Sequence, residues 1–256
     1  MRADPKPVAR RQKADVEAKQ METRYYPVML DIRDKPAIVI GGDRIAAEKA
    51  ANLSAAGAQV TVISQSFCAE LLDLERKRTV VLRSKSYAYG DLAGALVVIA
   101  ATTNNSELTE AIWNEAQEHQ QLINIVDVPH RCNFILPSVL KRGHLTISVS
   151  TEGTSPSLAK RIRQHLEGLF PSAYTAYFQL AAITRVYIKD HGLSYQERDA
   201  FFGDFFNSGI LECLTNGNQV EALETTVQLL QHYNIDISVT TLINDMKEAV
   251  ANHGRS

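Results

Sequence analysis

Between residues 27 and 127, short runs of β-branched residues alternate with helix-length amphipathic segments. The runs fit buried strands, and we predict strands at residues 37–40, 59–63, 80–82, 95–100 and 122–126. Helices are predicted between them at residues 45–56, 67–77 and 106–120. This alternation favours a parallel sheet, because each crossover helix returns the chain to the same edge of the sheet. The sequence therefore predicts an α/β fold that begins with a Rossmann-like domain at residues 24–127.

The pattern changes after Asp127, where the elements become shorter. We expect a helical turn led by Pro137, a strand at residues 145–150 and a helix from Pro156 to about residue 169. From residue 172 onward, apolar residues recur at helical spacing, with breaks near Gly192, Gly203 and Gly217. The sequence thus predicts a small α+β segment at residues 128–170 and a helical domain at residues 171–256.

Composition narrows the classes of partner and compartment. A formal net charge of −2 disfavours nucleic acid as a partner. No apolar stretch approaches the roughly 20 residues that a membrane-spanning helix needs, and the three cysteines are too few and too far apart to predict a disulfide framework. We therefore expect a cytoplasmic protein that does not bind membranes. The first 23 residues are polar, and we expect them to form a mobile arm.

A glycine-containing turn follows the first predicted strand. Gly41-Gly42-Asp43-Arg44-Ile45-Ala46 links that strand to a helix, which is the context of a dinucleotide-binding turn. In the G-x-G-x-x-G/A pattern, Gly41 permits the tight turn, but Asp43 replaces the middle glycine and its carboxylate would repel a pyrophosphate. We expect the cofactor to bind at Gly41, Gly42, Asp43, Arg44 and Ile45. The alternative is an α/β turn that no longer binds a nucleotide.

Two more strand ends are predicted to line the cofactor site. No acidic residue closes the second strand, where a carboxylate usually holds the adenosine ribose, so Ser64 or Ser66 would have to bond the ribose. Thr102 and Thr103 end the strand that precedes them. They either line the cofactor site or form an ordinary turn. The choice between NAD and NADP stays open on these residues.

Asp127 and a later helix start supply the other candidate groups. Asp127 falls at the carboxyl end of the strand predicted for residues 122–126, where ligands bind in open α/β sheets. It acts either as a general base or only as a cap for the turn before Pro129. Residues 153–156, Gly-Thr-Ser-Pro, predict a turn and a helix N-cap whose free N–H groups suit a carboxylate-rich or phosphorylated ligand. Lys160 and Arg161 follow, and they either bind such a ligand or form a solvated face.

Together these motifs resemble the precorrin-2 dehydrogenases of sirohaem synthesis, a family that includes bifunctional dehydrogenase–ferrochelatases. The resemblance rests on residues 26–32, 39–46, 100–103, 124–127 and 150–161, in matching order and spacing. It implies a Rossmann domain that binds NAD, a middle segment that forms a homodimer, a C-terminal helical domain, and an active site in a cleft between them. It also implies that Asp127 is the catalytic group in the oxidation of precorrin-2 to sirohydrochlorin.

The substrate of that family carries eight carboxylates, so the resemblance assigns its binding to cations, hydroxyls and free N–H groups. The residues predicted to bind it are Asn124, Ser150, Gly153, Thr154, Ser155, Lys160 and Arg161. Ser150 matches a family serine that is phosphorylated in some relatives. No ligand-spaced metal cluster is evident in the sequence. The alternatives are ferrochelatase activity, alone or in addition, a tetrapyrrole-binding protein with a weakened NAD site, and an NAD-dependent oxidoreductase of a small metabolite.

Overall fold

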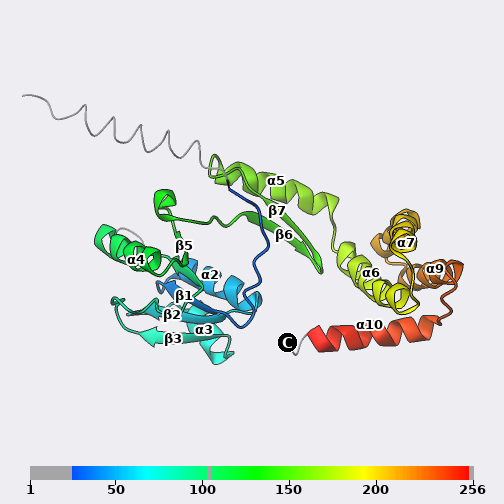
Figure 1. The fold of residues 1–256 in the computed structure, drawn as a ribbon, viewed down its shortest axis with the longest axis horizontal. Coiled ribbons are helices and arrows are strands. Elements are labelled where there is room, and N and C mark those ends of the chain that lie inside the picture. Colours follow the sequence, from blue (N-terminus) through cyan, green and yellow to red (C-terminus); the bar gives the residue numbers. More distant parts are fainter. Residues whose placement is uncertain (1–24, 103–104, 254–256) are drawn as a thin grey trace, which may run out of the picture. The chain divides into compact units, whose positions relative to one another are not determined.

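The computed structural model describes residues 25–102 and 105–253, without the side chains of residues 249–253. Within it the chain divides into two compact units, one that ends at Leu136 and one that begins at Pro137 (Figure 1). The predicted arm at residues 1–23 and the predicted cofactor residue Thr103 lie outside the described residues. The division into domains at residues 24–127, 128–170 and 171–256 stays a prediction.

A five-stranded parallel sheet forms the centre of the first unit (Figure 1). Its strands pair in the order β3-β2-β1-β4-β5. The strands are β1 (Pro36–Ile40), β2 (Gln59–Ser64), β3 (Val80–Ser84), β4 (Val97–Ala100) and β5 (Leu122–Ile125). The helices of this unit are α2 (Arg44–Ala55), α3 (Ala69–Arg76) and α4 (Ser106–Glu118). The predicted α/β class and parallel sheet are confirmed.

Both faces of the central strands β1 and β4 are buried, and successive residues of these strands point to opposite sides. Val39 and Ile99 pack with α2 and α3 on one face. Ile40 and Val98 pack with Ile112 of α4 on the other face. A strand that is buried on both faces reads as a continuous apolar run rather than an alternating one, which is why these strands stand out in the sequence.

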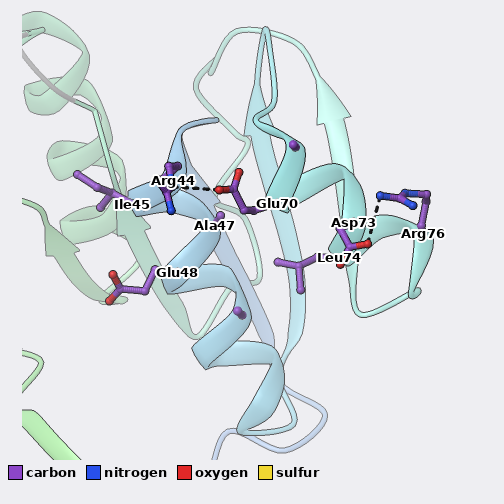
Figure 2. A pocket seen from close by; sticks show the side chains of 10 residues that line it. Arg44, Ile45, Ala47, Glu48, Glu70, Asp73, Leu74 and Arg76 are labelled. Atoms are coloured by element: carbon purple, nitrogen blue, oxygen red, sulfur yellow. Dashed lines mark ion pairs between the residues drawn. The ribbon is translucent and has the colours of Figure 1, made fainter.

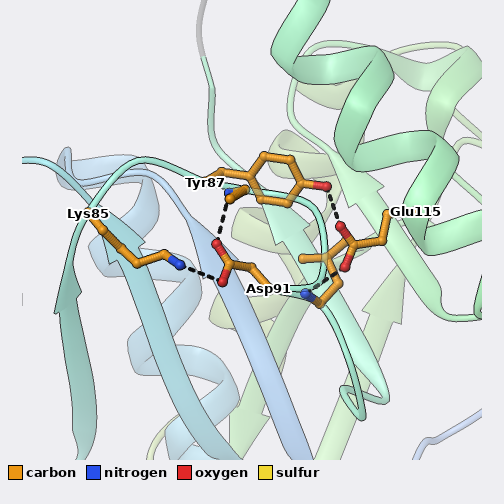
Figure 3. Close-up of polar contacts among 6 residues, drawn as sticks. Lys85, Tyr87, Asp91 and Glu115 are labelled. Carbon is orange, nitrogen blue, oxygen red and sulfur yellow. Dashed lines mark hydrogen bonds and ion pairs between the residues drawn. The ribbon is translucent and has the colours of Figure 1, made fainter.

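A buried carboxylate fastens the loop between β3 and β4 onto α4 (Figure 3). Glu115 of α4 is 1% exposed, and it accepts hydrogen bonds from the Leu92 N–H at 2.8 Å and the Tyr87 hydroxyl at 2.5 Å. Burial, and then the bond to Glu115, raise the pKa of Tyr87. In the same loop Lys85 Nζ lies 2.6 Å from Asp91 Oδ1. These contacts let the loop cover the second face of the sheet alongside α4.

The edge strand β5 is covered by the segment that follows it. Asn133 donates from its N–H to Ile123 O at 3.0 Å and accepts from Ile123 N at 2.8 Å through its side chain. The Cys132 thiol lies against Ile125, which donates from its N–H to Sγ at 3.2 Å, and burial raises the pKa of this thiol. Residues 132–134 therefore belong to the first unit and shield the edge strand from pairing with another chain.

The second unit begins with a hairpin, β6 (Ser138–Arg142) and β7 (Leu145–Val149), paired antiparallel. The helical turn predicted after Pro137 is therefore wrong. Gly143, with φ of 57°, and His144 make the two-residue connection, and such short connections with positive φ favour a hairpin. A Cβ on Gly143 would also lie 3.3 Å from Thr175 Cγ2, so the turn packs closely on the following helix.

Helices make up the rest of the second unit. They are α5 (Pro156–Leu169), α6 (Ala173–Asp190), α7 (Tyr195–Asn207), α8 (Ile210–Thr215), α9 (Gln219–His232) and α10 (Val239–His253). The predicted break near Gly203 is wrong, because α7 buries Phe201 and Phe205 one turn apart and this packing outweighs the cost of about 1 kcal/mol for glycine in a helix. In the part of the chain that the structure describes, no helix is long and apolar enough to cross a membrane.

Candidate active site

The register of the sheet brings the predicted cofactor turn and Asp127 to one edge. Ile40 of β1 pairs with Ile63 of β2 on one side and with Ala100 of β4 on the other, and Ala100 pairs with Ile125 of β5. The residues that follow these strand ends therefore lie along the same carboxyl edge, where open α/β sheets bind their ligands. They include Gly41, Ser64, Thr102 and Asp127.

The turn after β1 has room only for glycine. A Cβ on Gly41, whose φ is 137°, would lie 2.7 Å from Ala101 O. A Cβ on Gly42 would lie 1.8 Å from Ser66 O, and Gly42 O also accepts a hydrogen bond from the Cys68 N–H at 2.7 Å. The two glycines thus let the backbone of the turn pack closely against the residues that follow the neighbouring strands.

Asp43 caps α2 with its own carboxylate. Its Oδ1 accepts a hydrogen bond from the Ala46 N–H at 2.9 Å, which makes Asp43 the N-cap residue. A pyrophosphate at a helix start uses these same backbone donors. Among the described residues, the N–H groups of Arg44 and Ile45 have no hydrogen-bond acceptor. The turn therefore fits a dinucleotide through two free N–H groups and side-chain-free glycines, with one carboxylate beside them.

The side chains of Arg44 and Ile45 leave this turn. They line a pocket of about 980 Å³ between α2 and α3 (Figure 2). Figure 2 shows Arg44 directed towards Glu70 of α3, and the Arg44 Nε lies 3.0 Å from Glu70 Oε1. The backbone of these two predicted cofactor residues therefore lies at the turn, and their side chains do not.

Among the described residues, the hydroxyls of Ser64 and Thr102 make only long contacts. Ser64 Oγ lies 3.5 Å from the Ser66 N–H, and Thr102 Oγ1 lies 3.5 Å from Thr109 Oγ1. Hydrogen bonds of this kind are short when they are strong, near 2.7–3.0 Å. Both hydroxyls therefore keep bonding capacity for a ligand at the carboxyl edge.

Asp127 has a left-handed backbone, with φ of 61°. It is exposed, in a turn that the Val128 N–H closes on Ile125 O at 3.2 Å. Arg78 and Gln120 also have positive φ, but they directly follow the C-caps of α3 and α4, where that conformation is common. Asp127 instead follows a strand at the ligand-binding edge, and strained residues at such edges are candidates for function.

The other predicted residue near Asp127 has a structural contact. Asn124 Nδ2 donates to Phe134 O at 3.0 Å, so its amide nitrogen helps to hold the segment that covers β5. The role in substrate binding that the sequence suggests for Asn124 stays a prediction.

The helix start in the second unit is built as the sequence predicts. Ser155 is the N-cap of α5, and its Oγ accepts from the Leu158 N–H at 3.3 Å. Ser150 Oγ accepts from the Glu152 N–H at 3.0 Å, and the Thr154 N–H donates to Thr151 O at 2.8 Å. Gly153 follows Glu152 with φ of 85°. Residues 150–155 therefore form a compact hydrogen-bonded loop that leads into α5.

The cations that follow on α5 differ in their pairing. Arg163 forms an ion pair with Glu167 one turn later. Lys160 and Arg161 are exposed and have no ion-pair partner in the described parts of the chain. An unpaired exposed cation is available to an anionic ligand, so Lys160 and Arg161 stay the predicted substrate cations of this unit.

Sequence reasoning missed an ion pair made by Arg131, four residues after Asp127. Arg131, in the short helix η1 (Pro129–Arg131), binds Glu110 of α4 through two bonds of 2.8 and 2.9 Å. Its guanidinium carbon also lies 5.6 Å from the centre of the Trp113 ring. The partners are 21 residues apart, and no local pattern links them. Across residues 25–102 and 105–253, no group of three or more His, Cys, Asp or Glu is arranged to hold a metal ion.

Comparisons with known proteins agree with this arrangement. The family model described as "Putative NAD(P)-binding" matches residues 28–138, and that of "Sirohaem biosynthesis protein central" matches residues 142–169. Two curated proteins named siroheme synthase, from Zymomonas mobilis subsp. mobilis and Methylobacillus flagellatus, are 32% and 35% identical over 210 residues. The match covers 82% of this chain and 44% of each relative, so the chain spans less than half of their length. A solved structure, SirC, precorrin-2 dehydrogenase, has a TM-score of 0.67 and 27% identity, and the match covers 79% of this chain and 98% of that one.

Proposed function

Because the chain belongs to the precorrin-2 dehydrogenase family of sirohaem synthesis, we propose that it oxidises precorrin-2 to sirohydrochlorin with NAD as cofactor. The observation that carries this proposal is the coverage of SirC, because 98% of that solved dehydrogenase has a counterpart here. The curated synthases extend beyond the matched region, and the proposal does not include any activity of their remaining parts. The three free cysteines suit a reducing cytoplasm as the compartment of this activity.

The carboxyl edge of the sheet is the proposed cofactor site. NAD, when bound, supplies the hydride acceptor. The free N–H groups of Arg44 and Ile45 would hold its pyrophosphate, beside Gly41 and Gly42. Ser64, at the end of β2, would bond the adenosine ribose in place of the usual carboxylate. Thr102 would line the same edge from β4.

Asp127 is the proposed general base. The oxidation removes a proton as well as a hydride from the macrocycle, and a positioned carboxylate can take that proton. Asp127 lies at the same sheet edge as the proposed cofactor site, and its exposure leaves its carboxylate open to a substrate. A carboxylate there also needs no metal to act as a base.

The proposed substrate contacts lie in the second unit, at Ser150, Gly153, Thr154, Ser155, Lys160 and Arg161. The double variant Lys160→Glu with Arg161→Glu, which reverses both charges, should raise the KM for precorrin-2 by about tenfold or more. Each lost bond to a charged group is worth roughly 1.5–3 kcal/mol. The kcat at saturation should change little, because such contacts bind substrate and transition state alike.

The matched control is Arg185→Glu with Lys189→Glu, the same charge change on exposed positions of α6. It should leave the KM unchanged. Steady-state kinetics with purified precorrin-2 measures both variants. An unchanged KM in the Lys160 and Arg161 variant would mean that these two side chains face only solvent.

The activity itself is tested by absorbance. Incubation of the protein with precorrin-2 should give the spectrum of sirohydrochlorin only when NAD is present. Binding of precorrin-2 without conversion would contradict the proposal and leave a tetrapyrrole-binding protein. Conversion of sirohydrochlorin that depends on iron, without any NAD-dependent step, would instead assign a ferrochelatase.

A homodimer through residues 128–170 is the proposed assembly. Leu158 and Leu169 of α5 are 50% and 58% exposed, and Val139 of β6 is 45% exposed. A two-stranded hairpin is marginal by itself, so covering this apolar surface with a second copy would stabilise it. Sedimentation velocity at micromolar concentration should show a dimer, and a monomer there would contradict this assembly.

A further inference from the structure

The loop that carries Asp127 packs on the cluster that includes α4 through Val128 and Cys132, and Arg131 adds an ion pair to α4. The Arg131 guanidinium pairs with both carboxylate oxygens of Glu110, and it also lies over Trp113, one turn further along α4. A planar guanidinium is suited to both contacts at once, because it presents two parallel N–H donors and can stack on an aromatic ring. The pair is partly buried, with 32% of the Arg131 side chain and 46% of the Glu110 side chain exposed.

Two backbone hydrogen bonds connect Arg131 to the turn around Asp127. The Arg131 N–H donates to Val128 O at 2.9 Å, and the Val128 N–H donates to Ile125 O at 3.2 Å. Asp127 therefore lies inside a turn whose next residue, Val128, is bonded by the Arg131 N–H and also by the Cys132 thiol, which donates to Val128 O at 3.3 Å. A left-handed backbone costs an ordinary L-residue roughly 1–2 kcal/mol and an aspartate less than that, and the strain that remains persists only where the surroundings hold it.

We propose that Arg131 is a positioning residue, and that its clamp on Glu110 and Trp113 holds Asp127 in the left-handed turn, with the carboxylate at the carboxyl edge of the sheet. The kinetic consequence rests on the proposed role of Asp127 as the base. The structural consequence does not, because it concerns only the conformation of residues 125–131. The two consequences are therefore tested separately.

The structural test uses hydrogen exchange of the turn. Arg131→Ala should raise the hydrogen-exchange rate of the Val128 amide by about tenfold or more, because the strain of Asp127 then opens the turn. Glycine adopts the left-handed backbone without strain. In an Asp127→Gly background, Arg131→Ala should therefore raise the exchange rate of the Val128 amide by less than half of the fold increase that it causes in the wild-type background. Equal increases in both backgrounds, or no increase in either, would overturn the proposal.

The kinetic test compares kcat with KM on the full chain. Arg131→Ala should lower kcat for precorrin-2 oxidation by about ten- to a hundredfold, the range that a displacement near 1 Å can cost. The KM for NAD should change less than twofold. Arg131→Lys keeps the charge but loses the bidentate geometry, so it should restore part of the kcat. A purely structural role would lower the amount of folded protein without changing kcat per folded molecule.

The matched control is Arg76→Ala, which removes an exposed arginine paired with Asp73 on α3 of the same unit. This variant should leave both the kcat and the hydrogen-exchange rate of the Val128 amide unchanged. If Asp127→Asn keeps full activity, the proposed base is wrong, whereas the exchange comparison still decides the role of Arg131. The positioning role would be overturned if Arg131→Ala keeps the wild-type kcat while Asp127→Asn loses activity.

Discussion

Asp127→Asn is expected to lower the kcat of precorrin-2 oxidation by about 10²- to 10⁴-fold, the contribution of a positioned general base. The amide matches the carboxylate in shape but does not take up the proton. Asparagine also tolerates the left-handed backbone at φ of 61°, so the turn should keep its conformation. Calorimetric titration should therefore show unchanged NAD binding while steady-state kinetics shows the loss.

Asp34→Asn is the matched control for this variant. Asp34 is also an exposed aspartate with a left-handed backbone, at φ of 58°. It lies just before β1, at the opposite end of the strand from the proposed site. Asp34→Asn should keep full activity. Full activity in Asp127→Asn as well would remove Asp127 from the mechanism and leave its carboxylate as a turn residue.

Asp43→Gly is expected to tighten NAD binding by about tenfold, or about 1.4 kcal/mol. The glycine removes a negative charge from beside the pyrophosphate, and it also frees the Ala46 N–H that the Asp43 carboxylate now occupies. The change should cost α2 only a few tenths of a kcal/mol, because glycine is itself an acceptable N-cap. A titration of NAD into both proteins gives the ratio of the dissociation constants.

Asp43→Asn separates the two causes. Its side-chain oxygen can still cap Ala46, but the charge is gone, so tighter NAD binding in this variant would identify charge repulsion as the cause. Tighter binding in Asp43→Gly alone would identify the occupied N–H. Ser194→Gly, which removes the N-cap of α7 in the second unit, should leave NAD binding unchanged. Weaker or equal binding in both Asp43 variants would contradict a pyrophosphate at this turn.

Local patterns predicted most of the elements that build the site. The helix predicted at 156 to about 169 is confirmed as α5 with Ser155 as its N-cap, because capping chemistry depends on neighbours in the chain. The central strands β1 and β4 were predicted because both of their faces are buried. The family resemblance was also confirmed, since it rests on motifs with fixed spacing.

Predictions were wrong where distant contacts override local preference. Pro137 suggested a helical turn, but the pairing of β6 with β7 makes that segment a strand. Gly203 suggested a break, but burial of Phe201 and Phe205 keeps α7 continuous. In both cases packing contributes more free energy than the propensity of a single residue.

The sequence by itself determined the α/β class and the resemblance to the precorrin-2 dehydrogenases, and it placed the carboxyl end of each strand to within about two residues, because these follow from periodicity and from motifs read along the chain. Only the tertiary structure decided that the Asp43 carboxylate already occupies a donor of α2, and that Asp127 has a left-handed backbone beside the Arg131 clamp. Glu110 and Arg131 are 21 residues apart. Their contact depends on how α4 packs beside β5, and such packing is set by the whole core rather than by any local pattern.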